Sequence, residues 1–163
     1  MSEIHHKLAK LKPFSDFHLA DSSHGGELLC GLNSLRRTKT FCSVFLKTRT
    51  EHQGFAVHRE VLVAFSPYFK ELCENDSAAA SPKEILLQEL NPSVLVSIIE
   101  YLYTGALTIT TENAQDIFNA AVLLQLKTLR TVTETYLVKC ISPQNCLQIM
   151  TLAHKCDSHQ LLE

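Results

Sequence analysis

The stretch that decides the fold is residues 41–73, FCSVFLKTRTEHQGFAVHREVLVAFSPYFKELC. Its first part is rich in aromatic and β-branched residues, which favour strands, and it predicts a strand over residues 41–47. After a polar turn, Phe55 and Val57 alternate with other residues and predict a second strand, antiparallel to the first. The apolar period then lengthens to about three and a half residues, which predicts a helix from Arg59. The stretch therefore predicts a β-hairpin followed by helical structure.

The helical part of this stretch is divided at Ser66-Pro67. Proline disfavours helical geometry at the residue before it, yet it suits the first turn of a new helix, and serine is a good N-cap. We therefore expect a short helix over residues 59–65 and a second helix that begins at Pro67.

Periodicity and turn residues predict the other elements as well. They are a helix over 27–37, a loop over 74–84, a strand over 85–87, a helix from Pro92 that stops at Gly105, a strand at Leu107 and Ile109, and helices over 113–126, 128–139 and 145–155.

Four short motifs stand at fixed spacing along this chain. They are Phe41-Cys42, then Val57-His58-Arg59 followed by Val61-Leu62, then Ser66 followed by Tyr68-Phe69, and finally Tyr101-Leu102-Tyr103-Thr104-Gly105. Together they resemble the BTB (POZ) domain. The resemblance implies an α+β fold, in which a small β-sheet is flanked by a cluster of α-helices and is followed by the first helices of a BACK region.

The chain divides into three regions on this basis. Residues 1–26 are polar and predict a flexible leader. Residues 27–140 are expected to form the BTB domain, and residues 141–163 resemble the start of the BACK region of Kelch-like proteins. The apolar stripe of the last predicted helix needs a partner that the remaining residues do not provide, so we expect the chain to be a fragment or a short product of a longer protein.

Composition limits the class of protein. The chain has 163 residues, 45% of them hydrophobic, and can bury about two-thirds of its unfolded surface in one core. A net charge of −2 and a pI near 6.4 give no basic surface for nucleic acid or an anionic membrane. No apolar run approaches the roughly 20 residues that a membrane span needs, and residues 1–10 lack the continuous apolar segment of a secretory signal. We expect an intracellular protein, cytoplasmic rather than nuclear.

The strongest candidate for a metal site is Cys146, His154, Cys156 and His159. Structural zinc sites usually take two ligands from one tight turn, whereas His154 and Cys156 are two positions apart on a predicted helix and point to different faces. We interpret the four as ordinary helix residues, and we interpret all six cysteines as reduced thiols.

No catalytic constellation is found in the sequence. The adjacent residues His58, Arg59 and Glu60 diverge at a strand-to-helix junction, and no nucleophile elbow accompanies them. Glycine-rich nucleotide-binding motifs are missing as well. The sequence therefore predicts a protein-protein interaction module, with no enzymatic activity, no cofactor, no metal and no small-molecule ligand.

The helix expected over residues 27–37 carries a leucine stripe that could cover its own core. In BTB domains, however, the matching helix packs against its twofold mate, often with exchange of the N-terminal strand. The resemblance implies a homodimer. Its predicted interface residues are Leu28, Leu29, Leu32, Leu35 and Phe41.

Kelch-like BTB proteins are adaptors: the BTB dimer and the first BACK helices bind cullin-3, and a distal propeller holds the substrate for ubiquitination. By resemblance, the cullin surface here comprises Tyr68, Phe69, Leu72, Ser77, Ala78, Ala79 and Gln125. The family normally carries an apolar residue, any residue and then glutamate at the positions of Ser77 to Ala79. That motif is missing from this chain.

A second departure concerns a groove near the dimer interface. BTB domains commonly carry aspartate at the position of Ser43, where it faces the basic residue that matches Arg59. Without this partner, Arg59 is expected to reach solvent, Glu60 or another acid, because an unpaired buried charge costs several kcal/mol. This weakens the case for a groove of the transcriptional-repressor type.

Three functions remain open. The first is a Kelch-like adaptor for a cullin-3 ubiquitin ligase. The second is a dimerising scaffold, for cytoskeletal or other partners, that does not bind cullin. The third is a BTB transcriptional repressor, which the BACK-like segment disfavours. Kelch repeats of about 50 residues or zinc fingers beyond residue 163 would discriminate between these functions.

Overall fold

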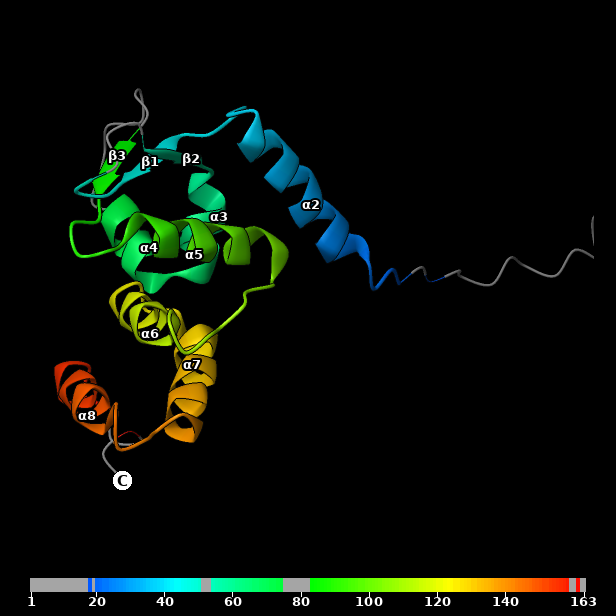
Figure 1. Cartoon of the computed structure of the whole chain (residues 1–163). Helices are drawn as coiled ribbons and strands as arrows, with labels where there is room; N and C mark the ends of the chain where they lie inside the picture. The colour runs from blue at the N-terminus through cyan, green and yellow to red at the C-terminus, as the bar shows by residue number, and fades with distance from the viewer. Residues whose placement is uncertain (1–17, 19, 51–53, 75–82, 159–160, 162–163) are drawn as a thin grey trace, which may run out of the picture.

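The structure, a computed structural model, describes residues 18, 20–50, 54–74, 83–158 and 161 (Figure 1). A small sheet lies above a stack of helices, and one helix projects to the side. The elements in chain order are α2 (His24–Arg37), β1 (Val44–Lys47), β2 (Phe55–Val57), α3 (Arg59–Phe65), α4 (Pro67–Glu74), β3 (Lys83–Leu86), α5 (Pro92–Thr104), α6 (Ala114–Leu123), α7 (Lys127–Lys139) and α8 (Cys146–Lys155). This arrangement confirms the predicted α+β class.

The sheet has the strand order β2-β1-β3. Val44 on the central strand pairs with Val57 of antiparallel β2 and with Lys83 of parallel β3. The predicted hairpin is therefore present. The first strand begins at Val44 rather than at Phe41, because Phe41 has a φ of 57°, a left-handed conformation that does not fit a strand.

Helix α5 is the centre of the molecule, and its ends are those expected from the sequence. The side chain of Asn91 accepts a hydrogen bond from the backbone N–H of Ser93 at 3.1 Å, Pro92 opens the first turn, and Gly105 ends the helix in the left-handed conformation. Its apolar residues fill the main core, which includes Val44, Leu46, Val57, Leu62, Phe69, Leu95, Ile98, Leu102, Ile117 and Leu124.

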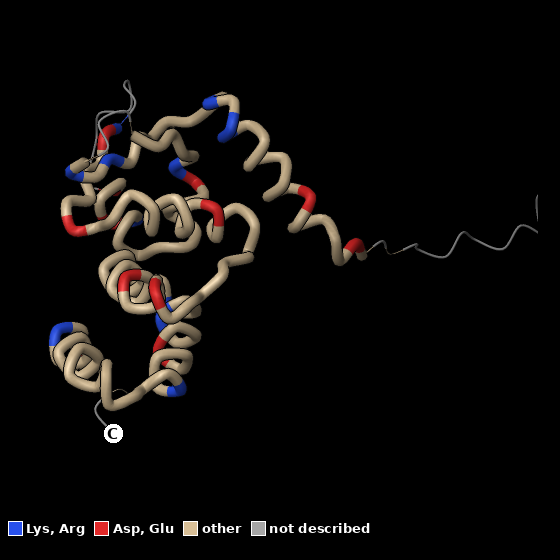
Figure 2. Tube along the Cα trace, viewed as in Figure 1, with Lys and Arg blue, Asp and Glu red and all other residues tan. Residues whose placement is uncertain are grey.

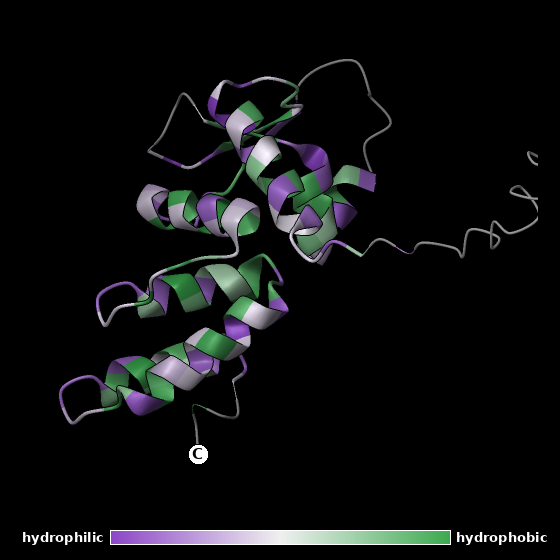
Figure 3. Ribbon diagram, turned by 90° about the vertical axis from the view of Figure 1, so that its right-hand side faces the viewer, coloured by the Kyte–Doolittle hydropathy of each residue, from purple (hydrophilic) through white to green (hydrophobic). Residues whose placement is uncertain are grey.

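A second, smaller core joins the last three helices. It contains Phe118 of α6, Leu137 of α7, and Ile149, Leu152 and Ala153 of α8. The stacked helices of the lower half alternate apolar and polar residues along their length, as amphipathic helices do (Figure 3). Part of the apolar stripe on α8 therefore packs against α6 and α7 of this chain, a partner that was not expected from the sequence.

The strand expected at Leu107 and Ile109 is not formed within the described residues. Residues 106–110 carry no strand assignment, although both side chains pack partly against the main core. The alternation of apolar and polar residues here reflects the partial burial of Leu107 and Ile109, not pairing with a neighbouring strand. Most of the predicted leader (residues 1–26) and most of the predicted loop (residues 74–84) lie outside the described residues.

None of the helices in the described part of the chain is long and apolar enough to span a membrane.

Candidate functional site

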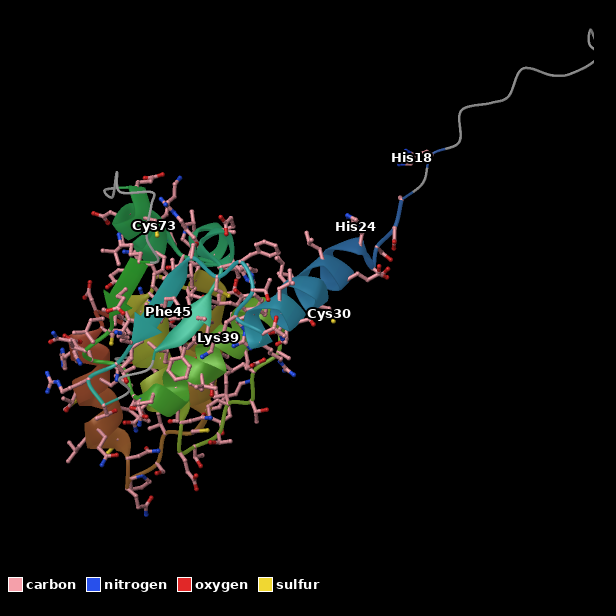
Figure 4. All side chains as sticks on the ribbon, turned by 90° about the horizontal axis from the view of Figure 1, so that it is seen from above. His18, His24, Cys30, Lys39, Phe45 and Cys73 are labelled. Atoms are coloured by element: carbon pink, nitrogen blue, oxygen red, sulfur yellow. The ribbon has the colours of Figure 1, made fainter. Side chains whose placement is uncertain are left out.

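Helix α2 carries the predicted dimer residues. Leu28 is 59% exposed, Leu29 and Leu35 are half-buried, and Leu32 packs against the main core. Phe41, just beyond the helix, is 80% exposed. The helix projects away from the rest of the molecule (Figures 1 and 4). Its apolar residues therefore divide into a part that holds the helix to its own core and a part that faces solvent.

The C-terminal turn of α2 is held on α5 by a cluster around Arg36. The guanidinium pairs with Glu100 through Nη2, donates from Nε to Asn33 Oδ1 at 2.9 Å, and lies 5.1 Å from the centre of the Tyr103 ring. Burial works to raise the pKa of Glu100, but the hydrogen bond and charge of Arg36, with the charge of Arg37, outweigh it and hold that pKa below its usual value. The acidic residue in the first turn of α2 and the basic residues in its last turn also interact favourably with the helix dipole (Figure 2).

A buried hydrogen-bond network fixes the connection from α2 to the sheet. The backbone N–H of His58 donates to Tyr103 Oη at 2.9 Å, and the Tyr103 hydroxyl lies 2.8 Å from His58 Nδ1. On the other side of the ring, Nε2 lies 3.2 Å from the carbonyl oxygen of Thr40. Neutral His58 with its proton on Nε2 satisfies all three contacts, because Nδ1 then accepts from the tyrosine.

The predicted cullin surface is only partly described. Tyr68 and Leu72 are half-buried and Gln125 is exposed, whereas Phe69 is 1% exposed and lies in the main core. Phe69 therefore supports this surface from beneath rather than forming part of it, which corrects the prediction at that position. Ser77, Ala78 and Ala79 lie outside the described residues.

A cavity of about 530 Å³ lies beside this surface. Its lining includes Pro67 and Lys70 of α4, Gln125 just before α7 and Lys127 at the start of α7. Most of the other lining residues are apolar, among them Phe65, which is 45% exposed. The structure thus places α4 and Gln125 around one largely apolar depression that is also lined by two lysines.

Arg59 takes a partner that the sequence did not indicate. Its Nη2 donates to the carbonyl oxygen of Cys73 at the end of α4, and Lys83 donates from Nζ to the neighbouring carbonyl of Leu72 at 2.5 Å. Helix-end carbonyls are electronegative and favour cations. Half-buried Arg59 is therefore compensated at least in part by the end of a helix, while Ser43 is exposed.

Three of the four candidate zinc residues lie within the described part of the chain. Cys146 and His154 are exposed and Cys156 is buried, whereas His159 lies outside the described residues. Among the residues that the structure describes, no three His, Cys, Asp or Glu side chains are placed to hold a metal ion.

The cluster of Arg36, Glu100 and Tyr103 was missed by sequence reasoning. Glu100 stands 64 positions from Arg36, and nothing local in either segment indicates the pairing. A signal was available in the polar residues of otherwise apolar α5, since a charged group on a largely buried helix needs a partner.

Comparison with known proteins agrees with this geometry. The BTB/POZ domain family matches residues 32–141. The chain is similar to human Kelch-like protein 31, with 33% identity over 135 residues, and to human Kelch-like protein 41, with 36% identity over 131 residues. These matches cover 83% and 80% of this chain but 20% and 21% of the relatives, so the chain spans about a fifth of the length of the curated relatives it matches.

Solved structures agree as well. The BTB domain of human Gigaxonin aligns with a TM-score of 0.64 at 29% identity, over 76% of this chain and 99% of that one. The BTB domain of zebrafish PATZ1, at 24% identity and a TM-score of 0.67 over the same shares, supports the fold. Fold, motifs and matched residues lead to one conclusion: the chain belongs to the BTB/POZ domain family, with homologues among the Kelch-like proteins.

Proposed function

We propose that this chain is the homodimerising BTB module of an intracellular, non-enzymatic Kelch-like adaptor for a cullin-3 ubiquitin ligase. The observation that carries the proposal is the projecting half of α2, whose side chains, apart from half-buried Leu29, are exposed in the described part of the chain. The similarity to Kelch-like proteins supports the adaptor class.

The dimer is supported by exposed apolar side chains on α2 and just beyond it. Leu28 on the projecting half of α2 is 59% exposed, and Phe41, four residues after the helix, is 80% exposed. Exposed aromatic and leucine side chains are typical of an interaction surface. A twofold axis beside α2 buries the same residues on both copies, so one self-complementary surface covers the exposed side chains of both protomers.

Binding of cullin is supported by the cavity between α4 and the start of α7. An apolar depression that is bordered by Lys70 and Lys127 suits a helix with an apolar anchor residue and acidic neighbours. The missing motif at Ser77 to Ala79 works against this binding. Loss of an apolar anchor and of a charge-assisted hydrogen bond costs about 1–3 kcal/mol each, or ten- to more than a hundredfold in affinity.

The missing motif also favours a second candidate, a dimerising scaffold that does not bind cullin. This function needs the α2 surface alone and places no demand on the cavity. The two functions therefore differ in a single measurable contact.

The test is a calorimetric titration of the purified chain with the cullin-3 N-terminal domain, with light scattering on the same sample. The adaptor predicts a dimer that binds one cullin per protomer with sub-micromolar affinity. Lys70→Glu should weaken this binding at least tenfold, whereas Lys139→Glu, on an exposed lysine at the far end of α7, should not. A folded dimer that shows no binding at tens of micromolar cullin would leave the scaffold as the function.

A further inference from the structure

Among the described residues, the contacts of helix α2 with the rest of the chain are concentrated in its C-terminal half. Residues 24–31 are exposed except for half-buried Leu29, and a side chain added at Gly25, Gly26 or Gly31 would meet nothing within 4 Å. The polar contacts of the helix with α5 lie in its last turn, at Arg36 and Arg37. The direction of α2 is therefore set at its C-terminal end.

Two contacts at that end converge on one buried side chain, Tyr103. Its ring lies under the Arg36 guanidinium, and its hydroxyl bonds both the backbone and the ring of His58. His58 in turn holds the carbonyl oxygen of Thr40. Tyr103 thus contacts the last turn of α2 directly and reaches the segment that follows it through one histidine.

The segment between α2 and β1 depends on these contacts because its backbone is strained. Lys39 and Phe41 both have a φ of 57°, and a non-glycine residue in the left-handed conformation costs roughly 1–2 kcal/mol. Such a conformation persists where the surroundings hold it. The bond from His58 to Thr40 lies between the two strained residues, where it restrains both.

We propose that Tyr103 is a positioning residue for the contact between two copies of α2, although it lies 1% exposed in the core. The inference rests on the proposed dimer. Helix α2 has 14 residues and is about 20 Å long, so a change of about 10° at its base moves its free end by about 3.5 Å. That displacement is close to a full contact distance between apolar side chains. In a twofold interface both helices are displaced.

The test is a double-mutant cycle on the dimer dissociation constant, measured by sedimentation equilibrium for wild type, Tyr103→Phe, Leu28→Ala and the double variant. Tyr103→Phe keeps the ring under Arg36 and removes the hydroxyl that holds His58. We expect it to weaken the dimer about tenfold. We also expect the Leu28→Ala effect to shrink at least threefold in the Tyr103→Phe background, because a misdirected helix no longer presents Leu28 to its partner.

Tyr101→Phe is the matched control: Tyr101 lies on the same helix and is half-buried, but it makes no bond to His58. It should leave both the dimer and the Leu28 effect unchanged. If Tyr103→Phe does not fold, Arg36→Lys replaces it in the double-mutant cycle with Leu28→Ala, because it removes the guanidinium that contacts the Tyr103 ring.

The outcomes separate the two proposals. A wild type that stays monomeric removes the dimer and with it the positioning role. A wild type that dimerises, with Tyr103 and Leu28 effects that add on the logarithmic scale, overturns the positioning role alone. A purely structural role for Tyr103 lowers the urea midpoint and leaves this additivity intact.

Discussion

Lys39 occupies a position at the end of α2 that favours glycine. Its N–H donates to the carbonyl of Arg36 and the next N–H, of Thr40, donates to the carbonyl of Leu35, which is the hydrogen-bond pattern of a Schellman motif. The residue has a φ of 57°. Lys39→Gly should therefore stabilise the protein by about 1 kcal/mol in urea denaturation, since relief of the left-handed strain exceeds the entropy cost of glycine.

Lys139→Gly is the control for this change. Lys139 is the last residue of α7, and glycine in a helix costs up to about 1 kcal/mol. Equal destabilisation by both glycines would show that Lys39 is not strained.

Glu100 makes the attachment of α2 dependent on pH. Its pKa in the folded protein lies below its usual value of 4.5, so the folded state binds its proton less readily than the unfolded state does. The stabilisation is present at pH above that usual value and is lost as the pH falls through the folded pKa. Amide exchange in α2 should accelerate over that range in wild type, whereas Glu100→Gln should lack the transition. Parallel pH profiles for both proteins would contradict the assignment.

The segment that follows α8 is held on α7 by a buried polar pair. The hydroxyl of Ser158, which is 1% exposed, donates to the carboxylate of Glu134, which is 9% exposed, and accepts the backbone N–H of Leu161 at 3.3 Å. Glu134→Ala leaves that hydroxyl without its acceptor and should cost about 1–3 kcal/mol.

The loss should be local, because α8 belongs to the smaller core. Hydrogen exchange in Glu134→Ala should rise across Cys146–Lys155 and stay unchanged in α5. Glu112→Ala, on an exposed residue, is the control. Uniform loss of protection throughout the chain would mean that the two cores unfold together.

The elements with strong local signals were predictable from sequence. Asn91, Pro92 and Gly105 mark the ends of α5 by side-chain capping, fixed φ and positive φ, and these are properties of single residues. The strand predictions were wrong where the residue pattern or composition of a strand had another cause. Leu107 and Ile109 alternate because both face the core, and Phe41 has the composition of a strand residue but a left-handed backbone.

At the scale of the whole molecule, the projecting helix α2 with exposed Leu28 is the surface proposed for a second copy. Leu28→Asp places a charge on that surface and should convert the proposed dimer to a monomer, as read by light scattering. Leu147→Asp is the matched control, since Leu147 on α8 is 72% exposed and lies outside the proposed contact. Dissociation by Leu147→Asp alone would move the interface to the other end of the molecule.

The candidate site was predictable only where neighbouring segments are close in sequence or follow a family motif. The leucines of α2 and the meeting of Gln125 with α4 were expected. The pairing of Arg36 with Glu100 was not expected, because it joins residues 64 positions apart in the chain. The bond of Arg59 to Cys73, 14 positions away, was not expected either, because it depends on how α3 packs against α4.

The mixed pairing of β1 also has a consequence for the order of assembly. Its antiparallel neighbour follows it closely in sequence, but its parallel neighbour comes only after α3 and α4. Closure of the longer loop carries the larger entropy cost and slows folding. During synthesis, β1 and β2 leave the ribosome before β3. One edge of β1 therefore has no paired strand until residues 83–86 have emerged.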